Sequence, residues 1–151
     1  MLYGLDFVSG VMSLLVTTLV LWVLQPLARR LNLLDHPYGR KDHANPTPVT
    51  GGVAIFIGCA VAFVWSQTST QAFLAAAGVV VAMGVYDDMR DMRWYTRILI
   101  QAFAALIIIF WGGVRVEQLG PAFGLESLPL GWLSVPFTVF ATIGIINAMN
   151  M

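Results

Sequence analysis

The chain has 151 residues, of which 58% are hydrophobic and only 11% are charged, and its mean hydropathy is +0.79. This composition excludes an ordinary soluble domain and indicates an all-α integral membrane protein. Its eight basic and eight acidic side chains cancel, so the chain lacks the bulk positive charge that attracts nucleic acid.

The first predicted transmembrane helix covers residues 7–28, a run long enough to cross a hydrocarbon core of about 30 Å at about 1.5 Å per residue. A cleaved signal peptide carries its positive charges before its apolar run. Here Asp6 precedes the run, and Arg29 and Arg30 follow it. We therefore expect a retained anchor whose N-terminus lies outside the cytoplasm.

Residues 29–49 form the first polar segment, and its prolines at positions 37, 46 and 48 disfavour helix and predict an extended loop. Two further transmembrane runs are predicted at 50–67 and 71–86, separated by a short turn rich in Ser, Thr and Gln.

Three carboxylates, Asp87, Asp88 and Asp91, follow a run of residues 71–86 that carries no formal charge. On a continuous helix Asp87 and Asp88 point about 100° apart, and Asp91 falls between them. Neighbouring carboxylates repel by roughly 3–4 kcal/mol at ~4–5 Å and an effective dielectric of ~20. A bound Mg²⁺, or the arginines at 90, 93 and 97, would relieve that repulsion. The alternative is a hydrated loop of mixed charge, in which surface ion pairs contribute almost nothing.

The fourth and fifth predicted transmembrane runs cover residues 97–114 and 130–147, and a loop rich in Gly and Pro joins them. Asn147 and Asn150 are three residues apart at the end of the fifth run, so a helix places them on one face. Asparagines at a helix end can also simply cap it.

The distribution of basic residues predicts the orientation of these helices. Of the eight Lys and Arg residues, four lie in segment 29–49, three lie at positions 90, 93 and 97, and only Arg115 lies between the last two runs. The positive-inside rule then makes 29–49 and 87–96 cytoplasmic loops, with an N-out, C-in topology. The polar loop, the acidic cluster and the terminal asparagines thus emerge on one face, where a water-soluble substrate can meet a membrane-embedded one.

Four segments, in order, resemble the motifs of the polyprenyl-phosphate N-acetylhexosamine-1-phosphate transferases, glycosyltransferase family 4. They are Leu34-Asp35-His36-Pro37 with Arg40-Lys41-Asp42-His43, similar to D-x-P…R-K-x-H; Thr47-Pro48-Val49-Thr50-Gly51-Gly52, similar to P-x-x-G-G; Asp87-Asp88-Met89-Arg90-Asp91 with Arg97 and Gln101, similar to D-D-x-x-D…R-x-x-x-Q; and Asn147-Ala148-Met149-Asn150-Met151, similar to the start of N-A-x-N-M-x-D-G. The resemblance is greatest to the bacterial branch that acts in O-antigen, enterobacterial common antigen or teichoic acid assembly. It is weaker to the peptidoglycan translocase branch.

The resemblance implies that residues 1–151 are one membrane domain, the N-terminal part of a roughly ten-helix fold, and we expect this fragment to be inactive alone. The implied reaction transfers HexNAc-1-phosphate, with GlcNAc expected, from a UDP-sugar to undecaprenyl phosphate and releases UMP. It would begin the assembly of lipid-linked envelope glycans at the cytoplasmic face of the bacterial inner membrane. Mg²⁺ is the implied cofactor, with Mn²⁺ as the alternative. The implied partners are both substrates and membrane lipid but no nucleic acid, and a homodimer is allowed.

The resemblance also implies roles for the acidic residues. We expect Asp87 to act as the base or positioning group toward the lipid phosphate and Asp88 to bind the metal. A covalent aspartyl intermediate is an alternative to direct transfer. Asp35 and Asp91 are expected to organise the loops rather than to react.

The other predicted site residues would bind substrate: Arg40, Lys41, His43, Arg97, Asn147 and Asn150. Arg40 and Lys41 would meet phosphates, or only set the topology. His43 would bind phosphate or shape the loop, and Arg97 would reach the site or only snorkel to the interface. The asparagines would contact the nucleotide or the metal, with Asn150 as a metal ligand.

Two other functions compete with the transferase. A small transporter would place acids along an ion path, but none of the predicted runs carries a charge in its middle. A non-catalytic scaffold would bind lipid headgroups through its basic loop. Mg²⁺-dependent binding of a uridine nucleotide would favour the transferase over that scaffold.

Overall fold

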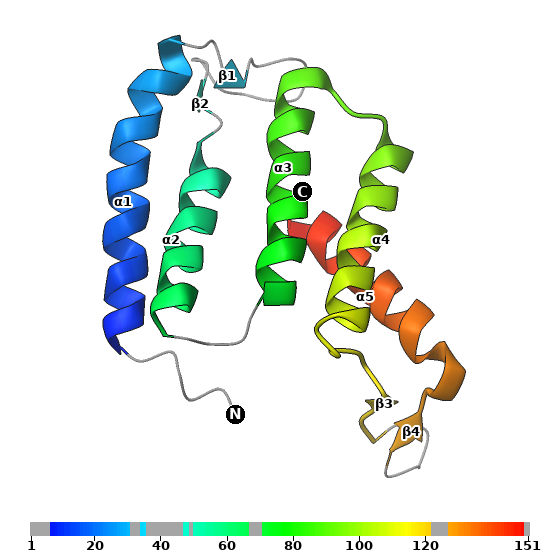
Figure 1. Cartoon of the computed structure of the whole chain (residues 1–151). Coiled ribbons are helices and arrows are strands. Elements are labelled where there is room, and N and C mark those ends of the chain that lie inside the picture. Colours follow the sequence, from blue (N-terminus) through cyan, green and yellow to red (C-terminus); the bar gives the residue numbers. More distant parts are fainter. Residues whose placement is uncertain are drawn as a thin grey trace. The chain divides into compact units, whose positions relative to one another are not determined.

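A computed structural model describes residues 7–30, 34–35, 47–48, 50–66, 71–121 and 127–149. Within these residues the fold is helical: α1 (Phe7–Arg30), α2 (Gly51–Trp65), α3 (Gln71–Arg90), α4 (Trp94–Phe110) and α5 (Ser134–Met149), the last preceded by the 3-10 turn η1 (Gly131–Leu133). Two short antiparallel pairs of strands complete the described elements, β1 (Leu34–Asp35) with β2 (Thr47–Pro48) and β3 (Gln118–Leu119) with β4 (Leu128–Pro129) (Figure 1).

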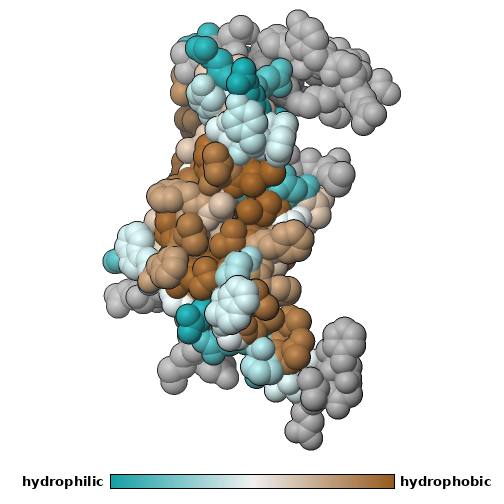
Figure 2. All heavy atoms as spheres, turned by 90° about the vertical axis from the view of Figure 1, so that its right-hand side faces the viewer, coloured by the Kyte–Doolittle hydropathy of each residue, from teal (hydrophilic) through white to brown (hydrophobic). Residues whose placement is uncertain are grey.

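The prediction of a helical fold is confirmed within the described residues. The described α-helices number five and match the five apolar runs, and three helical segments are long and apolar enough to cross a membrane: Phe7–Arg30, Gln71–Arg90 and Gly131–Met149. α2 and α4 have 15 and 17 residues, which correspond to only about 23 and 26 Å of helix. Figure 2 shows that hydrophobic side chains cover much of the face it presents.

The chain divides into two compact units, and α3 contributes to both of them. The first unit comprises Met1–Thr70 with Val81–Met92, and the second comprises Gln71–Val80 with Arg93–Met151.

In the first unit α1 packs against α2 through small side chains. Ala54, Gly58 and Ala62 are buried at intervals of one helical turn on α2. At Gly58 a Cβ atom would lie 2.7 Å from the carbonyl oxygen of Ser13 on α1, so no side chain fits there. Small residues allow two backbones to approach closely, which is how helices associate in lipid, where burial from water supplies no driving force between them.

In the second unit α4 packs against α5, and the outer loop is attached to the start of α5. The Ser134 hydroxyl donates a hydrogen bond to the carbonyl of Val116 (2.6 Å), and the N–H of Val116 donates to Thr138 Oγ1 (2.9 Å). Ser134 and Thr138 are both buried. Both backbone polar groups of Val116 are therefore satisfied by α5, which fixes the loop to the helix.

Candidate functional site

The acidic cluster lies on the last turn of α3 and in the turn that ends it. The helix continues past the apolar run at 71–86 and ends at Arg90, so Asp87 and Asp88 are helical. Asp91 has a φ of +47°, and its N–H donates to the carbonyl of Asp87 at 2.9 Å. This is the bond of a left-handed helix cap, a position usually taken by Gly and tolerated by Asn and Asp.

This cap changes one expectation and supports another. The position of Asp91 between Asp87 and Asp88, which holds on a continuous helix, does not apply here, because the helix ends at Arg90. The expectation that Asp91 organises its loop agrees with the left-handed backbone conformation by which it turns the chain out of α3.

The Asp87 carboxylate is held in place by the turn that follows it. Its Oδ1 accepts a hydrogen bond from the backbone N–H of Met92 at 2.9 Å, and the side chain is half-buried. Hydrogen bonds to ionised acceptors are roughly twice as strong as those between neutral groups. This contact was not predicted from the sequence, where its signal is an aspartate placed four residues before the residue that caps the helix.

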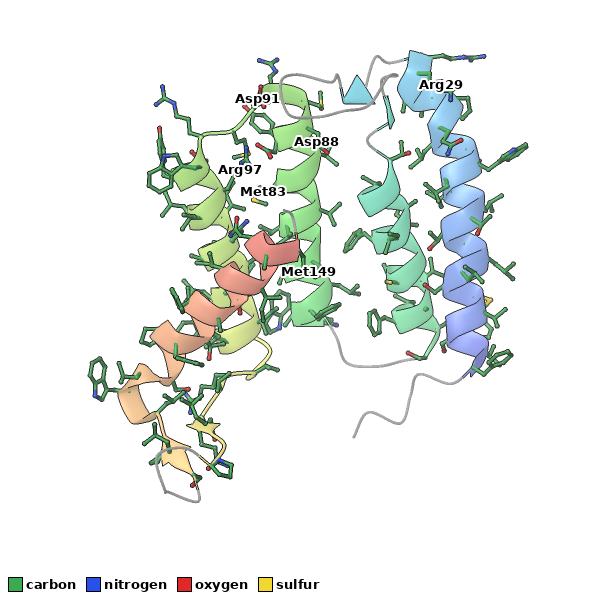
Figure 3. All side chains as sticks on the ribbon, turned by 180° about the vertical axis from the view of Figure 1, so that it is seen from behind. Arg29, Met83, Asp88, Asp91, Arg97 and Met149 are labelled. Carbon is green, nitrogen blue, oxygen red and sulfur yellow. The ribbon has the colours of Figure 1, made fainter. Side chains whose placement is uncertain are left out.

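Asp88 occupies a different environment. It is exposed, and a helix turns its side chain about 100° away from that of Asp87. Figure 3 shows Asp88 near the end of α3, with Asp91 at the end itself and Arg29 at the corresponding end of α1. The two adjacent carboxylates therefore differ in both direction and exposure, which suits two separate roles.

The polar loop that was predicted to carry the phosphate-binding residues begins and ends at this same end of the first unit. β1 and β2 pair with Leu34 opposite Pro48 and Asp35 opposite Thr47. Figure 1 places the pair near the end of α3 that carries the aspartates. Arg40, Lys41 and His43 fall between these strands and lie outside the described residues, as does Asn150.

In the second unit Asn147 joins α5 to α4. Its Nδ2 donates hydrogen bonds to Gln101 Oε1 (2.7 Å) and to the carbonyl of Ile143 (2.8 Å). Gln101 is only 3% exposed, and Asn147 is half-buried. Gln101 belongs to one of the four sequence motifs but was not predicted to have a role, although an uncharged polar residue inside an apolar run is expected to form a hydrogen bond.

Arg97 lies in the first turn of α4 and is half-buried, and its N–H donates to the carbonyl of Arg93 (3.3 Å). The exposed rings of Trp94 and Tyr95 begin this helix and meet edge to face at 5.9 Å. Such rings are typical of the membrane–water boundary. Arg97 therefore lies at the end of α4 that carries aromatic residues typical of a membrane interface.

The described residues contain no group of three or more His, Cys, Asp or Glu side chains able to hold a metal ion. Mg²⁺ differs from most protein-bound metals, since it keeps several waters and often takes only one or two carboxylates besides substrate phosphates. The exposed Asp88 at the end of α3 fits that mode of binding.

Comparison with known sequences agrees with the family resemblance of the four motifs. The sequence model described as glycosyl transferase family 4 matches residues 70–151. The chain is 37% identical over 128 residues to the undecaprenyl-phosphate alpha-N-acetylglucosaminyl 1-phosphate transferase of Haemophilus influenzae. The aligned residues make up 83% of this chain and 36% of the relative. It is 33% identical over 140 residues to the protein of the same name from Escherichia coli (strain K12). This alignment covers 91% of this chain and 38% of the relative.

A third relative is the probable undecaprenyl-phosphate N-acetylglucosaminyl 1-phosphate transferase of Bacillus subtilis, which is 29% identical over 148 residues, 95% of this chain and 41% of the relative. The chain thus spans about two fifths of the length of these relatives. No solved structure matches it at a significant level.

Proposed function

Because the chain belongs to glycosyl transferase family 4, we propose that the full-length protein transfers a HexNAc-1-phosphate from a UDP-sugar to undecaprenyl phosphate. GlcNAc-1-phosphate is the proposed group, since the similar proteins are named as N-acetylglucosaminyl 1-phosphate transferases. The products are undecaprenyl-diphospho-sugar and UMP. The observation that carries the proposal is the placement of Asp87 and Asp88 on the last turn of α3, a helix long and apolar enough to span a membrane.

The two aspartates have separate proposed roles, one toward the lipid phosphate and the other toward the metal. Asp87, fixed by the N–H of Met92, positions the phosphate of the lipid acceptor or takes its proton. The exposed Asp88 binds the metal together with water and substrate oxygens. Mg²⁺, or Mn²⁺ in its place, supplies charge neutralisation between two anionic substrates that otherwise repel.

The remaining site residues are proposed to bind the substrates. Arg40 and Lys41 bind phosphate oxygens, Arg as a planar fork and Lys as a point charge. His43 joins them on the same loop, and Arg97 adds a positive charge from the start of α4. Asn147 and Asn150 complete the set at the end of α5, Asn150 as a second metal ligand.

The proposed location is the bacterial cytoplasmic membrane, with the active face toward the cytoplasm. The excess of basic residues in 29–49 and at positions 90, 93 and 97 supports an N-out, C-in orientation. Arg29 and Asp88 lie toward the same end of the first unit in Figure 3, as this orientation requires. Lipid acceptor and nucleotide donor would then meet at the cytoplasmic surface.

The test is UMP release by the full-length protein in micelles that contain undecaprenyl phosphate, with a panel of UDP-sugars and with or without Mg²⁺. The proposal expects Mg²⁺-dependent release with UDP-GlcNAc preferred. Release with another UDP-HexNAc would keep the reaction and correct the sugar. The absence of release with every sugar, from protein shown to be folded, would overturn the proposal in favour of a scaffold that binds lipid headgroups.

A further inference from the structure

We propose that Gln101 is a positioning residue that holds the amide of Asn147 so that only its Oδ1 faces the ligand. Asn147 then binds a cation or an N–H or O–H donor of the substrate, and not a phosphate oxygen. This inference rests on the proposed function, because it concerns how Asn147 takes part in substrate binding.

The hydrogen bonds that Asn147 makes to described residues use its nitrogen and leave its oxygen. A side-chain amide has two N–H donors on nitrogen and one carbonyl oxygen. Both donors are used, one by Gln101 Oε1 at 2.7 Å and the other by the carbonyl of Ile143 at 2.8 Å. Among the residues that the structure describes, none donates a hydrogen bond to Asn147 Oδ1.

The orientation of this amide follows from its surroundings. Oxygen and nitrogen of an asparagine are assigned from their hydrogen-bond partners. The carbonyl of Ile143 can only accept, so the atom that lies 2.8 Å from it has to be Nδ2. Gln101 must then present its own oxygen, and the two side chains fix one another.

A purely structural role explains only part of this arrangement. The bond to Ile143, one turn earlier, is the ordinary local bond of a polar residue in a helix and needs nothing from α4. The second bond comes from an amide that is buried on α4 at 3% exposure. Hydrogen bonds between membrane helices contribute little to their association on average, so joining α5 to α4 does not by itself account for this bond. The additional effect of Gln101 is to fix the orientation of the Asn147 side-chain amide.

The orientation has a chemical consequence. A phosphate oxygen accepts hydrogen bonds, so an asparagine binds it through Nδ2, and here Nδ2 is occupied. Oδ1 instead suits a divalent cation, which prefers oxygen ligands, or a donor group such as the imide of a nucleobase, a ribose hydroxyl or the N–H of an acetamido sugar.

Three variants of the full-length protein test the inference. Gln101→Met keeps the length of the side chain and removes the acceptor, whereas Gln101→Glu keeps an acceptor oxygen toward Asn147. Thr142→Val is the matched control, since it removes a hydrogen bond within α5 (2.8 Å, to the carbonyl of Thr138) and leaves Asn147 untouched. Each is compared with wild type by its melting temperature and by the steady-state kinetics of UMP release.

Gln101→Met is expected to raise either the Mg²⁺ concentration for half-maximal rate or the KM for the UDP-sugar about tenfold, the size of effect typical of residues that orient a ligand. A shift in Mg²⁺ requirement identifies a cation at Oδ1, and a shift in KM at saturating Mg²⁺ identifies a donor group. The KM for undecaprenyl phosphate should not change, Gln101→Glu should restore most of the loss, and Thr142→Val should behave like wild type.

The inference is overturned if Gln101→Met behaves as wild type, if all kinetic parameters fall together with the melting temperature, or if Gln101→Glu is as impaired as Gln101→Met. If Gln101→Met does not fold, Gln101→Glu with wild-type kinetics supports the inference, and Gln101→Glu with an altered KM contradicts it. A wild-type protein that is inactive with every UDP-sugar would instead overturn the proposed function itself.

Discussion

The backbone N–H of Met92 donates a hydrogen bond of 2.9 Å to the carboxylate of Asp87, across the turn in which Asp91 takes a left-handed conformation. Asp87, the candidate catalytic residue, therefore also stabilises the turn that ends α3. A substitution at position 87 therefore affects both charge and local structure, and the two effects have to be separated.

Asp87→Asn and Asp87→Ala separate them. Asn keeps an oxygen that accepts from Met92 and removes the negative charge, so it should fold as wild type and lose more than tenfold in turnover, in line with the loss of a general base. Ala removes the acceptor as well, and it should cost about 1.5–3 kcal/mol in stability in addition. UMP release and thermal unfolding are the two measurements. Turnover of Asp87→Asn within tenfold of wild type would refute the assigned role.

Asp88 should respond differently, because its proposed role is toward the metal. Chelation of divalent cations is expected to abolish UMP release, and added Mg²⁺ or Mn²⁺ should restore it. Asp88→Asn removes a charged ligand, so it should raise the Mg²⁺ concentration for half-maximal rate by about 10–100-fold. Its stability should stay close to that of wild type, since Asp88 is exposed. A variant with reduced rate and an unchanged Mg²⁺ requirement would show that Asp88 has another role.

Asp91 is expected to act through the backbone alone. With φ at +47°, Asp91→Gly should be neutral or slightly stabilising and should keep its activity. Asp91→Val, a β-branched residue in the same conformation, should cost about 1–2 kcal/mol. Activity and unfolding of both variants provide the check. A large loss of turnover in a well-folded Asp91→Gly would place the carboxylate in the site.

The sequence predicted the five helices well, because uninterrupted apolar runs in a membrane protein have few other structures to adopt. It predicted the end of α3 less well. For the charged residues from Asp87 to Asp91, a continuous helix and a hydrated loop were both open. No Gly or Pro interrupts the helix there, so it continues to Arg90 and ends before Asp91, a residue that tolerates a left-handed turn.

The sequence predicted which residues belong to the site, but it did not predict the contacts between them. The bond between Gln101 and Asn147 joins positions 46 apart and depends on how α4 packs against α5, which no local pattern encodes. The contact of Asp87 with Met92 depends on the same turn that the sequence left undefined. Arg40, Lys41, His43 and Asn150 lie outside the described residues, and their roles stay predictions.

The close approach of α1 and α2 gives the last prediction. A Cβ at Gly58 would lie 2.7 Å from the carbonyl oxygen of Ser13 and even closer to the side chain of Thr17, so Gly58→Ala has to push the helices apart. We expect a cost of about 1–3 kcal/mol, as for overpacking in other well-packed interiors.

Gly10→Ala is the matched control for Gly58→Ala, because a Cβ at Gly10 meets nothing within 4 Å. In a helix that substitution should stabilise by up to about 1 kcal/mol through the better helix propensity of alanine. The measurement is thermal unfolding of both variants in the same detergent. If both were stabilised alike, α1 and α2 would not pack at Gly58. Opposite signs for one chemical change on two neighbouring helices would locate their interface at Gly58.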